Sequence, residues 1–69
     1  MKLPRDLSGR AVVKALERHG FTVVRQSGSH VRLVKAEKRV TVPLHRTLAV
    51  GTLQSILHQA GLRIDELAL

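Results

Sequence analysis

The sequence predicts an α+β fold in which three antiparallel strands form a sheet and two helices pack on one of its faces. Two observations support this prediction. Apolar residues recur at helical spacing near both ends of the chain, and residues 21–43 between them contain three strand-forming runs. The first two runs are separated by Ser27-Gly28-Ser29, a glycine flanked by serines that is typical of a hairpin turn. At 69 residues, the whole chain, 1–69, is expected to form one domain.

The first helix is expected over Gly9–His19, after a short lead-in, Met1–Leu7, in which Pro4 disfavours helix. Ser8 is placed to cap the N-terminus, because its hydroxyl can accept a hydrogen bond from a free amide of the first turn. Gly20 ends the helix, since glycine adopts the left-handed conformation without a Cβ clash. One side of the helix is apolar: Val12, Val13 and Leu16.

Three strands are expected next, over Phe21–Gln26, His30–Lys35 and Arg39–Pro43. The turn between the second and third strands, Ala36-Glu37-Lys38, contains neither glycine nor asparagine. Its geometry therefore does not follow from its residues as directly as that of the first turn.

Side chains alternate between the two faces of each strand, which separates a core face from an exposed one. Opposed antiparallel strands pair like faces, so one polar, basic face results. If the backbone stays extended past Pro43, parity adds His45 to that face. The core face receives Val31, Leu33, Val40 and Val42. The exposed face receives His30, Arg32, Arg39 and Thr41.

A loop over Leu44–Val50 leads to the second helix, which carries the clearest amphipathic stripe of the chain. Gly61 ends this helix, and Ile64–Leu67 is expected to form a short terminal turn. The stripe has i, i+3, i+4, i+7 spacing: Leu53, Ile56, Leu57 and Ala60. The predicted core consists of Leu33, Val40, Val42, Leu53, Ile56 and Leu57.

The composition points to a polyanionic partner. Twelve Lys and Arg residues against five Asp and Glu residues make the net charge +7. Between Arg25 and Arg46 there are six basic residues and one acid, Glu37. The alternative interpretation is a solvated surface that charge keeps soluble. No apolar run is long enough to span a membrane, and no cysteine is present, so a soluble cytoplasmic protein is expected.

Most catalytic chemistries lack their residues in this sequence. The four histidines have no paired spacing typical of a metal site, so neither a metal nor a cofactor is expected. No acid is placed to orient His30 for a Ser-His-Asp arrangement, and Ser27-Gly28-Ser29 is too poor in glycine for a phosphate-binding loop. Phe21 is the only aromatic residue, which disfavours modules that stack bases on exposed rings.

An imidazole on a cationic face remains. RNA supplies its own nucleophile, the 2′-hydroxyl, so strand cleavage needs a proton acceptor or donor and cations that hold the phosphate. His30 with Arg32 and Arg39 can supply these functions, and the amides of Gly28 and Ser29 can add donors. Two alternatives stay open on the residues alone: an RNA-binding module without catalysis, and an interaction domain for an acidic protein.

The ordered motifs resemble the HicA toxin family over about Leu7–Leu67. The resemblance is carried by Leu7-Ser8-Gly9, Gly20-Phe21, Gly28-Ser29-His30, Val40–Pro43 with His45, Gly51-Thr52-Leu53 and Ala60-Gly61-Leu62. It implies a double-stranded-RNA-binding-domain-like fold of order α-β-β-β-α and a ribosome-independent mRNA interferase. It also implies a HicB-type antitoxin that masks the active site. Many members of the family carry a glycine where this chain has Ala36-Glu37-Lys38.

The hypothesis from residues and resemblance together is a metal-independent mRNA endoribonuclease that inhibits translation and growth until its antitoxin binds. By this resemblance the functional histidine is His30. The residues expected to contact RNA are Gly28, Ser29, Arg25, Arg32, Lys35, Arg39 and His45. The expected partners are mRNA and a HicB-type antitoxin, without membrane or small-molecule cofactor.

Overall fold

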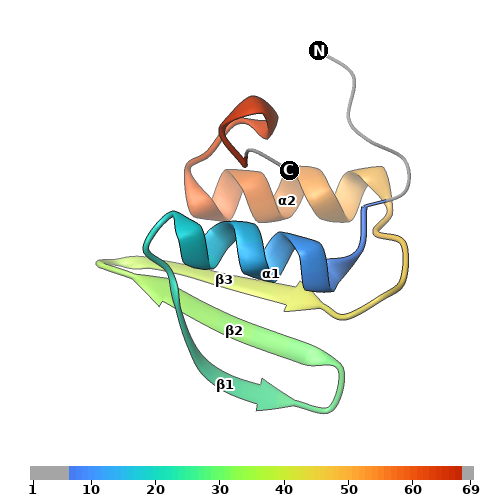
Figure 1. Ribbon diagram of the computed structural model, residues 1–69, viewed down its shortest axis with the longest axis horizontal. Coiled ribbons are helices and arrows are strands. Elements are labelled where there is room, and N and C mark those ends of the chain that lie inside the picture. Colours follow the sequence, from blue (N-terminus) through green and yellow to red (C-terminus); the bar gives the residue numbers. More distant parts are fainter. Residues whose placement is uncertain (1–6, 68–69) are drawn as a thin grey trace.

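The computed structural model describes residues 7–67, and the predicted order α-β-β-β-α is confirmed (Figure 1). Of the expected lead-in, all but Leu7 lies outside the described residues. The first strand begins and ends one residue later than expected, and the third begins one residue earlier. The elements are α1 (Gly9–Arg18), β1 (Thr22–Ser27), β2 (His30–Lys35), β3 (Lys38–Pro43), α2 (Val50–Ala60) and a 3-10 turn η1 (Ile64–Leu67).

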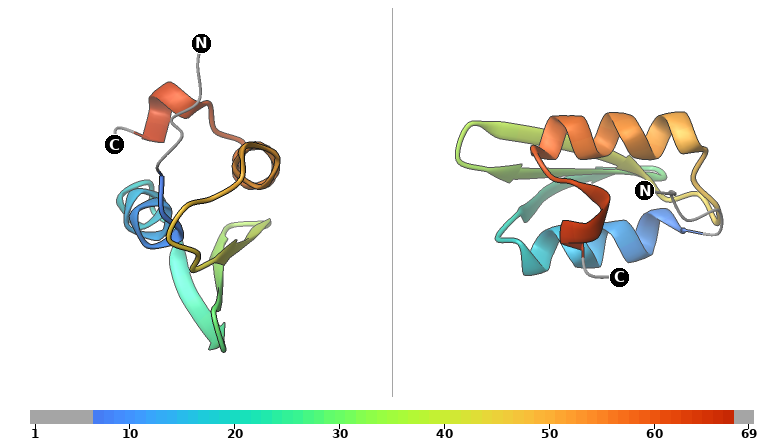
Figure 2. Two further views of the ribbon diagram at one scale, coloured as in Figure 1. Left: turned by 90° about the vertical axis from the view of Figure 1, so that its right-hand side faces the viewer. Right: turned by 90° about the horizontal axis from the view of Figure 1, so that it is seen from above.

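The molecule has two layers. The antiparallel sheet has the order β1-β2-β3, and both helices lie on one side of it (Figures 1 and 2). The helices contact chiefly β3, so β1 extends beyond the layer that they form (Figure 2). Every residue of β1 is exposed, including Val23 and Val24. The sheet face opposite the helices, here called the open face, is therefore free of covering elements within residues 7–67.

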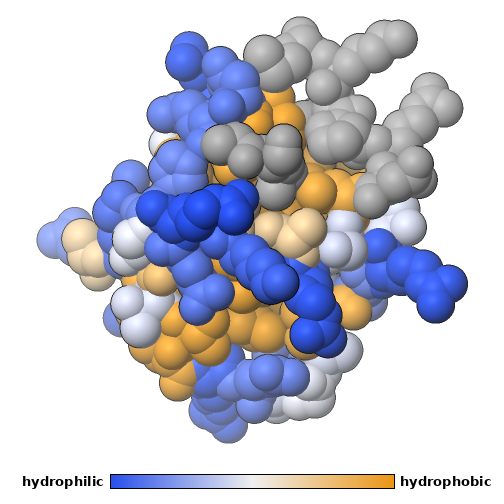
Figure 3. Space-filling model, viewed as in Figure 1, coloured by the Kyte–Doolittle hydropathy of each residue, from blue (hydrophilic) through white to orange (hydrophobic). Residues whose placement is uncertain are grey.

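The core lies between the helices and the inner face of β2 and β3. All six predicted core residues are buried, and Leu33, Val42, Leu53 and Ile56 are at most 1% exposed. Charged side chains spread over the outer surface, with apolar residues visible between them (Figure 3). Further buried residues extend this core: Leu7, Val12, Ala15, Leu16, Phe21, Val31, Leu48, Ala60 and Leu67.

Both helices end as the sequence predicts. The Ser8 hydroxyl accepts a hydrogen bond from the Ala11 amide (3.1 Å), which confirms the N-cap of α1. Gly20, with φ of 92°, follows α1, and Gly61, with φ of 69°, ends α2. Both glycines adopt a left-handed conformation that releases the chain from the helix at little steric cost.

The turn between β2 and β3 contains two residues, Ala36 and Glu37, because Lys38 already pairs with Lys35 in the sheet. Ala36 has φ of 54° and is the one described non-glycine residue with positive φ. Gly28 occupies the equivalent position of the β1–β2 turn, with φ of 58°. In both turns only the first central residue has positive φ, as in the type II′ turns that favour glycine there.

We predict that Ala36→Gly increases the free energy of unfolding by about 0.5–1 kcal/mol, because it removes the left-handed strain of a Cβ. Chemical denaturation at constant m-value measures the change. Glu37→Gly is the matched control: φ of Glu37 is not positive, so this change adds unfolded-state entropy without relieving strain. A less stable Ala36→Gly variant would contradict the assignment of strain to this residue.

Gly9 connects α1 to the end of β3. Its amide donates to the His45 carbonyl (3.0 Å), and a Cβ built on Gly9 would lie 1.9 Å from the Pro43 carbonyl oxygen. No side chain fits at that distance. The start of α1 therefore depends on glycine because the backbone after β3 runs against it.

We predict that Gly9→Ala decreases the free energy of unfolding by about 2 kcal/mol or more, since the added methyl forces the helix away from β3. Thermal unfolding then shows a midpoint lower by about 4–8 °C per kcal/mol. Gly51→Ala in α2 is the control, because nothing lies within 4 Å of its Cβ position. Helix propensity keeps that variant as stable as the wild type or makes it more stable. Equal losses in both variants would show that the close approach at Gly9 does not matter.

Candidate nucleic-acid site on the open sheet face

The strand register arranges the open-face side chains in three rows across the sheet. Val31 and Leu33 of β2 are buried under the helices, so the alternate residues of β2 lie on the open face. Directly opposed residues share a face, which assigns their partners on β1 and β3 as well. The rows are Ser27–His30–Pro43, Arg25–Arg32–Thr41 and Thr22–Val34–Arg39.

The first two rows form a depression of about 270 Å³. This volume is at the small end of ligand sites, which is suited to part of a nucleotide chain and not to a large cofactor. The depression is open to solvent, because all of its lining residues are exposed. It is lined by Arg25, Ser27, His30, Arg32 and Thr41.

A β-bulge at Val24 brings Arg25 into this depression. Val23 pairs with Leu33, and Arg25 pairs with the adjacent Arg32 of β2, so Val24 is an extra residue without a partner in the register. Without the bulge, Val23 and Arg25 would share a face. Instead Val23 lines a second depression, of about 220 Å³, which α1 borders, while Arg25 lines the first.

The depression carries positive charge that no acid of residues 7–67 offsets. Arg25 and Arg32 are directly opposed, and a like-charged pair in that position destabilises a sheet. No carboxylate of residues 7–67 lines the depression. Within residues 7–67, the side chains of Arg25, His30 and Arg32 make no hydrogen bond or ion pair with another protein group. An anion bound between the guanidinium groups would relieve this repulsion.

The described residues contain neither a metal cluster nor a helix suited to a bilayer. No group of three or more His, Cys, Asp or Glu side chains in residues 7–67 is placed to hold a metal ion. In the same part of the chain, no helix is both long and apolar enough to cross a membrane.

Gly28 and Ser29 form the turn beside the depression. The Gly28 carbonyl accepts a hydrogen bond from the Gln26 side chain (3.3 Å), and the Ser29 carbonyl accepts one from the Leu44 amide (2.6 Å). Nothing lies within 4 Å of the position that a Gly28 Cβ would occupy. The turn is thus held from both sides while its outer surface stays open to a ligand.

Of the seven residues expected to contact RNA, Arg25 and Arg32 line the depression and Gly28 and Ser29 form the turn beside it, whereas Arg39, His45 and Lys35 do neither. Arg39 is on the open face but in the third row. β3 ends at Pro43, so His45 lies in the following loop, where its carbonyl accepts from the Gly9 amide. His45 is exposed and does not line the depression, so its expected contact with RNA stays a prediction.

Lys35 faces the helices. Its ammonium donates to the His19 carbonyl (2.6 Å) at the C-terminus of α1 and lies 5.9 Å from the centre of the Phe21 ring. A cation at that position stabilises the helix end. Strand parity accounts for this placement, because Lys35 is an odd number of residues from both His30 and Arg32 along β2. Lys35 is therefore on the side of the sheet opposite the depression, and its expected contact with RNA stays a prediction.

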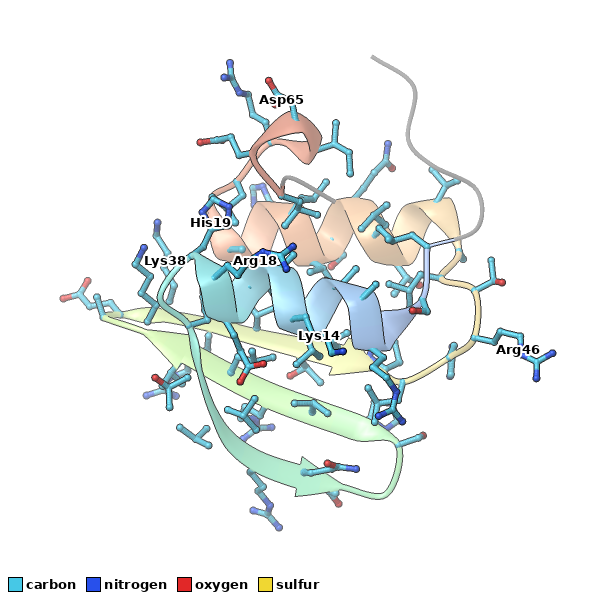
Figure 4. All side chains as sticks on the ribbon, in the orientation of Figure 1. Lys14, Arg18, His19, Lys38, Arg46 and Asp65 are labelled. Atoms are coloured by element: carbon cyan, nitrogen blue, oxygen red, sulfur yellow. The ribbon has the colours of Figure 1, made fainter. Side chains whose placement is uncertain are left out.

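His19 lies at the same end of α1. Its imidazole makes a hydrogen-bond contact with the Glu66 carbonyl of η1, so this side chain joins the helix to the last turn. In Figure 4, His19 and Lys38 lie toward one end of the molecule, and Arg46 lies in the loop at the other end. His19 therefore has a structural contact away from the depression.

Sequence reasoning missed Ser27 as a site residue, and it placed Thr41 on the open face without assigning it a role. The missing signal for Ser27 is the register: a two-residue turn places Ser27 directly opposite His30. Thr41 is directly opposite Arg32, and its amide donates to the Gln59 side chain of α2 (3.4 Å). Both hydroxyl groups are suited to hydrogen bonding with a phosphate.

Residues 9–62 of the chain match the family model described as the HicA toxin of bacterial toxin-antitoxin. A search of curated proteins finds no match. The matched segment contains α1, α2, all three strands and every residue that lines the depression. It also covers most of the described residues. The chain therefore belongs to the HicA toxin family and is a toxin of a bacterial toxin–antitoxin system.

Proposed function

We propose that the protein is a metal-independent endoribonuclease that cleaves mRNA at the His30 depression. The observation that carries this proposal is the position of one imidazole beside two guanidinium groups on an open surface, where none of residues 7–67 supplies a pairing acid. These groups match what phosphodiester cleavage by an internal nucleophile requires. A proton acceptor is present, together with cations for the phosphate.

In the proposed reaction the ribose 2′-hydroxyl attacks the adjacent phosphorus, and His30 accepts its proton. The phosphorus–O5′ bond breaks, and the leaving 5′ oxygen takes up a proton from His30 or from water. The products are a 2′,3′-cyclic phosphate and a 5′-hydroxyl end. No oxidant, reductant or metal is needed, because the substrate supplies the nucleophile and the protein supplies the proton transfer.

Arg25 and Arg32 offset the negative charge that gathers on the phosphate oxygens in the transition state. Guanidinium groups suit this role because they stay charged and present several donors in a plane. The Ser27 and Thr41 hydroxyls add neutral donors at the two sides of the depression. Backbone amides of the Gly28-Ser29 turn are available to phosphate at its end, and Arg39 contacts the RNA farther along the sheet.

The proposal includes the biological partners. Cleavage of cytoplasmic mRNA stops translation and growth, and a HicB-type antitoxin restores growth by covering the depression. Membership of a toxin–antitoxin family supports the presence of an inhibitory partner. The excess of basic residues between Arg25 and Arg46 in the sequence, together with Arg25 and Arg32 on the open face, supports both a polyanionic substrate and an acidic inhibitor.

We predict that His30→Ala reduces the rate of RNA cleavage by at least about 10²-fold, because it removes the proton-transfer group. Stability should change by at most about 0.5 kcal/mol, since His30 is exposed. Labelled mRNA is incubated with purified protein in EDTA, and fragments are quantified by gel electrophoresis. Growth on induction of each variant is measured alongside.

His58→Ala is the matched control, because His58 is an exposed histidine on α2 away from the depression. It should cleave RNA at the wild-type rate. A folded His30→Ala variant with full activity would refute the proposed role of the imidazole. Salt-sensitive RNA binding by the wild type without cleavage products would instead identify a binding module, and cleavage abolished by EDTA would contradict the metal-independent reaction.

A further inference from the structure

We propose that the depression binds two consecutive phosphates of one RNA strand, with the row of His30 on the phosphate that is cleaved and the row of Arg32 on its neighbour. This inference rests on the proposed function, because it divides the proposed site into a row where the reaction takes place and a row that only binds phosphate. It adds a substrate requirement: a phosphate next to the scissile one.

The spacing of the rows supports the division. His30 and Arg32 are two residues apart on the same face of β2, which separates their rows by roughly 6–7 Å along the strand. Successive phosphates of an extended nucleic-acid strand have a comparable separation. An RNA strand that runs along β2 therefore brings one phosphate to each row.

The chemistry of the two rows also differs. The first row presents an imidazole and the Ser27 hydroxyl, which are suited to proton transfer and weak neutral contacts. The second row presents two directly opposed guanidinium groups and the Thr41 hydroxyl. That concentration of charge, which no acid among the described residues offsets, is suited to tight binding of a phosphate that does not react.

Both rows depend on the register of β1. The bulge at Val24 absorbs one extra residue, so that Arg25 remains opposite Arg32 while Val23 remains opposite Leu33. Removal of Val24 leaves a regular ladder with these same pairs. Removal of Gln26 also allows a regular ladder, but it places Arg25 opposite Val31 and therefore on the helix side of the sheet.

The probes for the test are thymidine dinucleotides, which lack the 2′-hydroxyl and cannot be cleaved by the proposed reaction. One probe has only the internal phosphate, TpT, and the others carry an additional terminal phosphate, pTpT or TpTp. Affinity for the wild-type chain is measured by NMR titration at fixed ionic strength. We expect pTpT, TpTp or both to bind with at least 10-fold higher affinity than TpT.

Substitutions distinguish binding of the terminal phosphate by the row of Arg32 from general attraction of an anion to a basic protein. Arg25→Ser and Arg32→Ser should each reduce the gain from the terminal phosphate to less than 3-fold. Lys14→Ser is the control, because it removes the same charge from the exposed side of α1 and should keep the gain (Figure 4). Equal gains in Arg25→Ser and Lys14→Ser, or no gain from either terminal phosphate in the wild type, would overturn the proposal.

Deletion of single residues tests the register with the same probes. The variant without Val24 should keep the gain, and the variant without Gln26 should lose it. Opposite or equal results in variants with wild-type circular dichroism would contradict the assigned rows. The probes report binding alone. If the wild-type chain shows the affinity gain from a terminal phosphate but does not cleave RNA, the proposed nuclease is refuted and the two-phosphate site stands.

Discussion

The register of the three strands determines which side chains meet on the open face. A two-residue turn at Gly28 places Ser27 opposite His30, and the bulge at Val24 places Arg25 opposite Arg32. The helices cover only the inner face of β2 and β3, so these side chains stay exposed. A shift of one residue in β1 would replace Arg25 by an apolar valine on this face. Position in the ladder, and not burial or a bonding network, thus assembles the proposed site.

The like charges at the proposed site destabilise the sheet. Two arginines face each other without an acid, and β1 has no neighbour on its outer edge within residues 7–67. Such a like-charged pair destabilises a strand ladder, and even a small loss matters for the stability of so small a domain. The compensating contacts lie on the other face, where Lys35 bonds the end of α1 and the apolar core is closed. The arrangement is understandable if a phosphate occupies the depression in the working state.

Much of this fold follows from patterns that the sequence displays directly. Alternation predicted that Val31, Leu33, Val40 and Val42 are in the core, and the apolar stripe predicted the buried side of α2. Both predictions are confirmed. Ser27 and the bulge at Val24 could not be found in this way, because each depends on how β1 pairs with β2 and not on alternation within one strand. Lys35 was expected to contact RNA because it lies in the basic segment of the sequence; in the structure its ammonium donates to the His19 carbonyl at the end of α1. The family match identifies the toxin family but leaves the chemistry of His30 to experiment.

The central claim is that the RNA supplies the nucleophile while His30 moves a proton. It is tested most directly with a cleavable RNA in which one ribose at a mapped cleavage point is replaced by deoxyribose. The account predicts that cleavage stops at that linkage alone, continues at the others, and leaves 2′,3′-cyclic phosphate ends. Continued cleavage at the deoxyribose linkage would mean that water or a protein group attacks the phosphorus, and it would contradict the account.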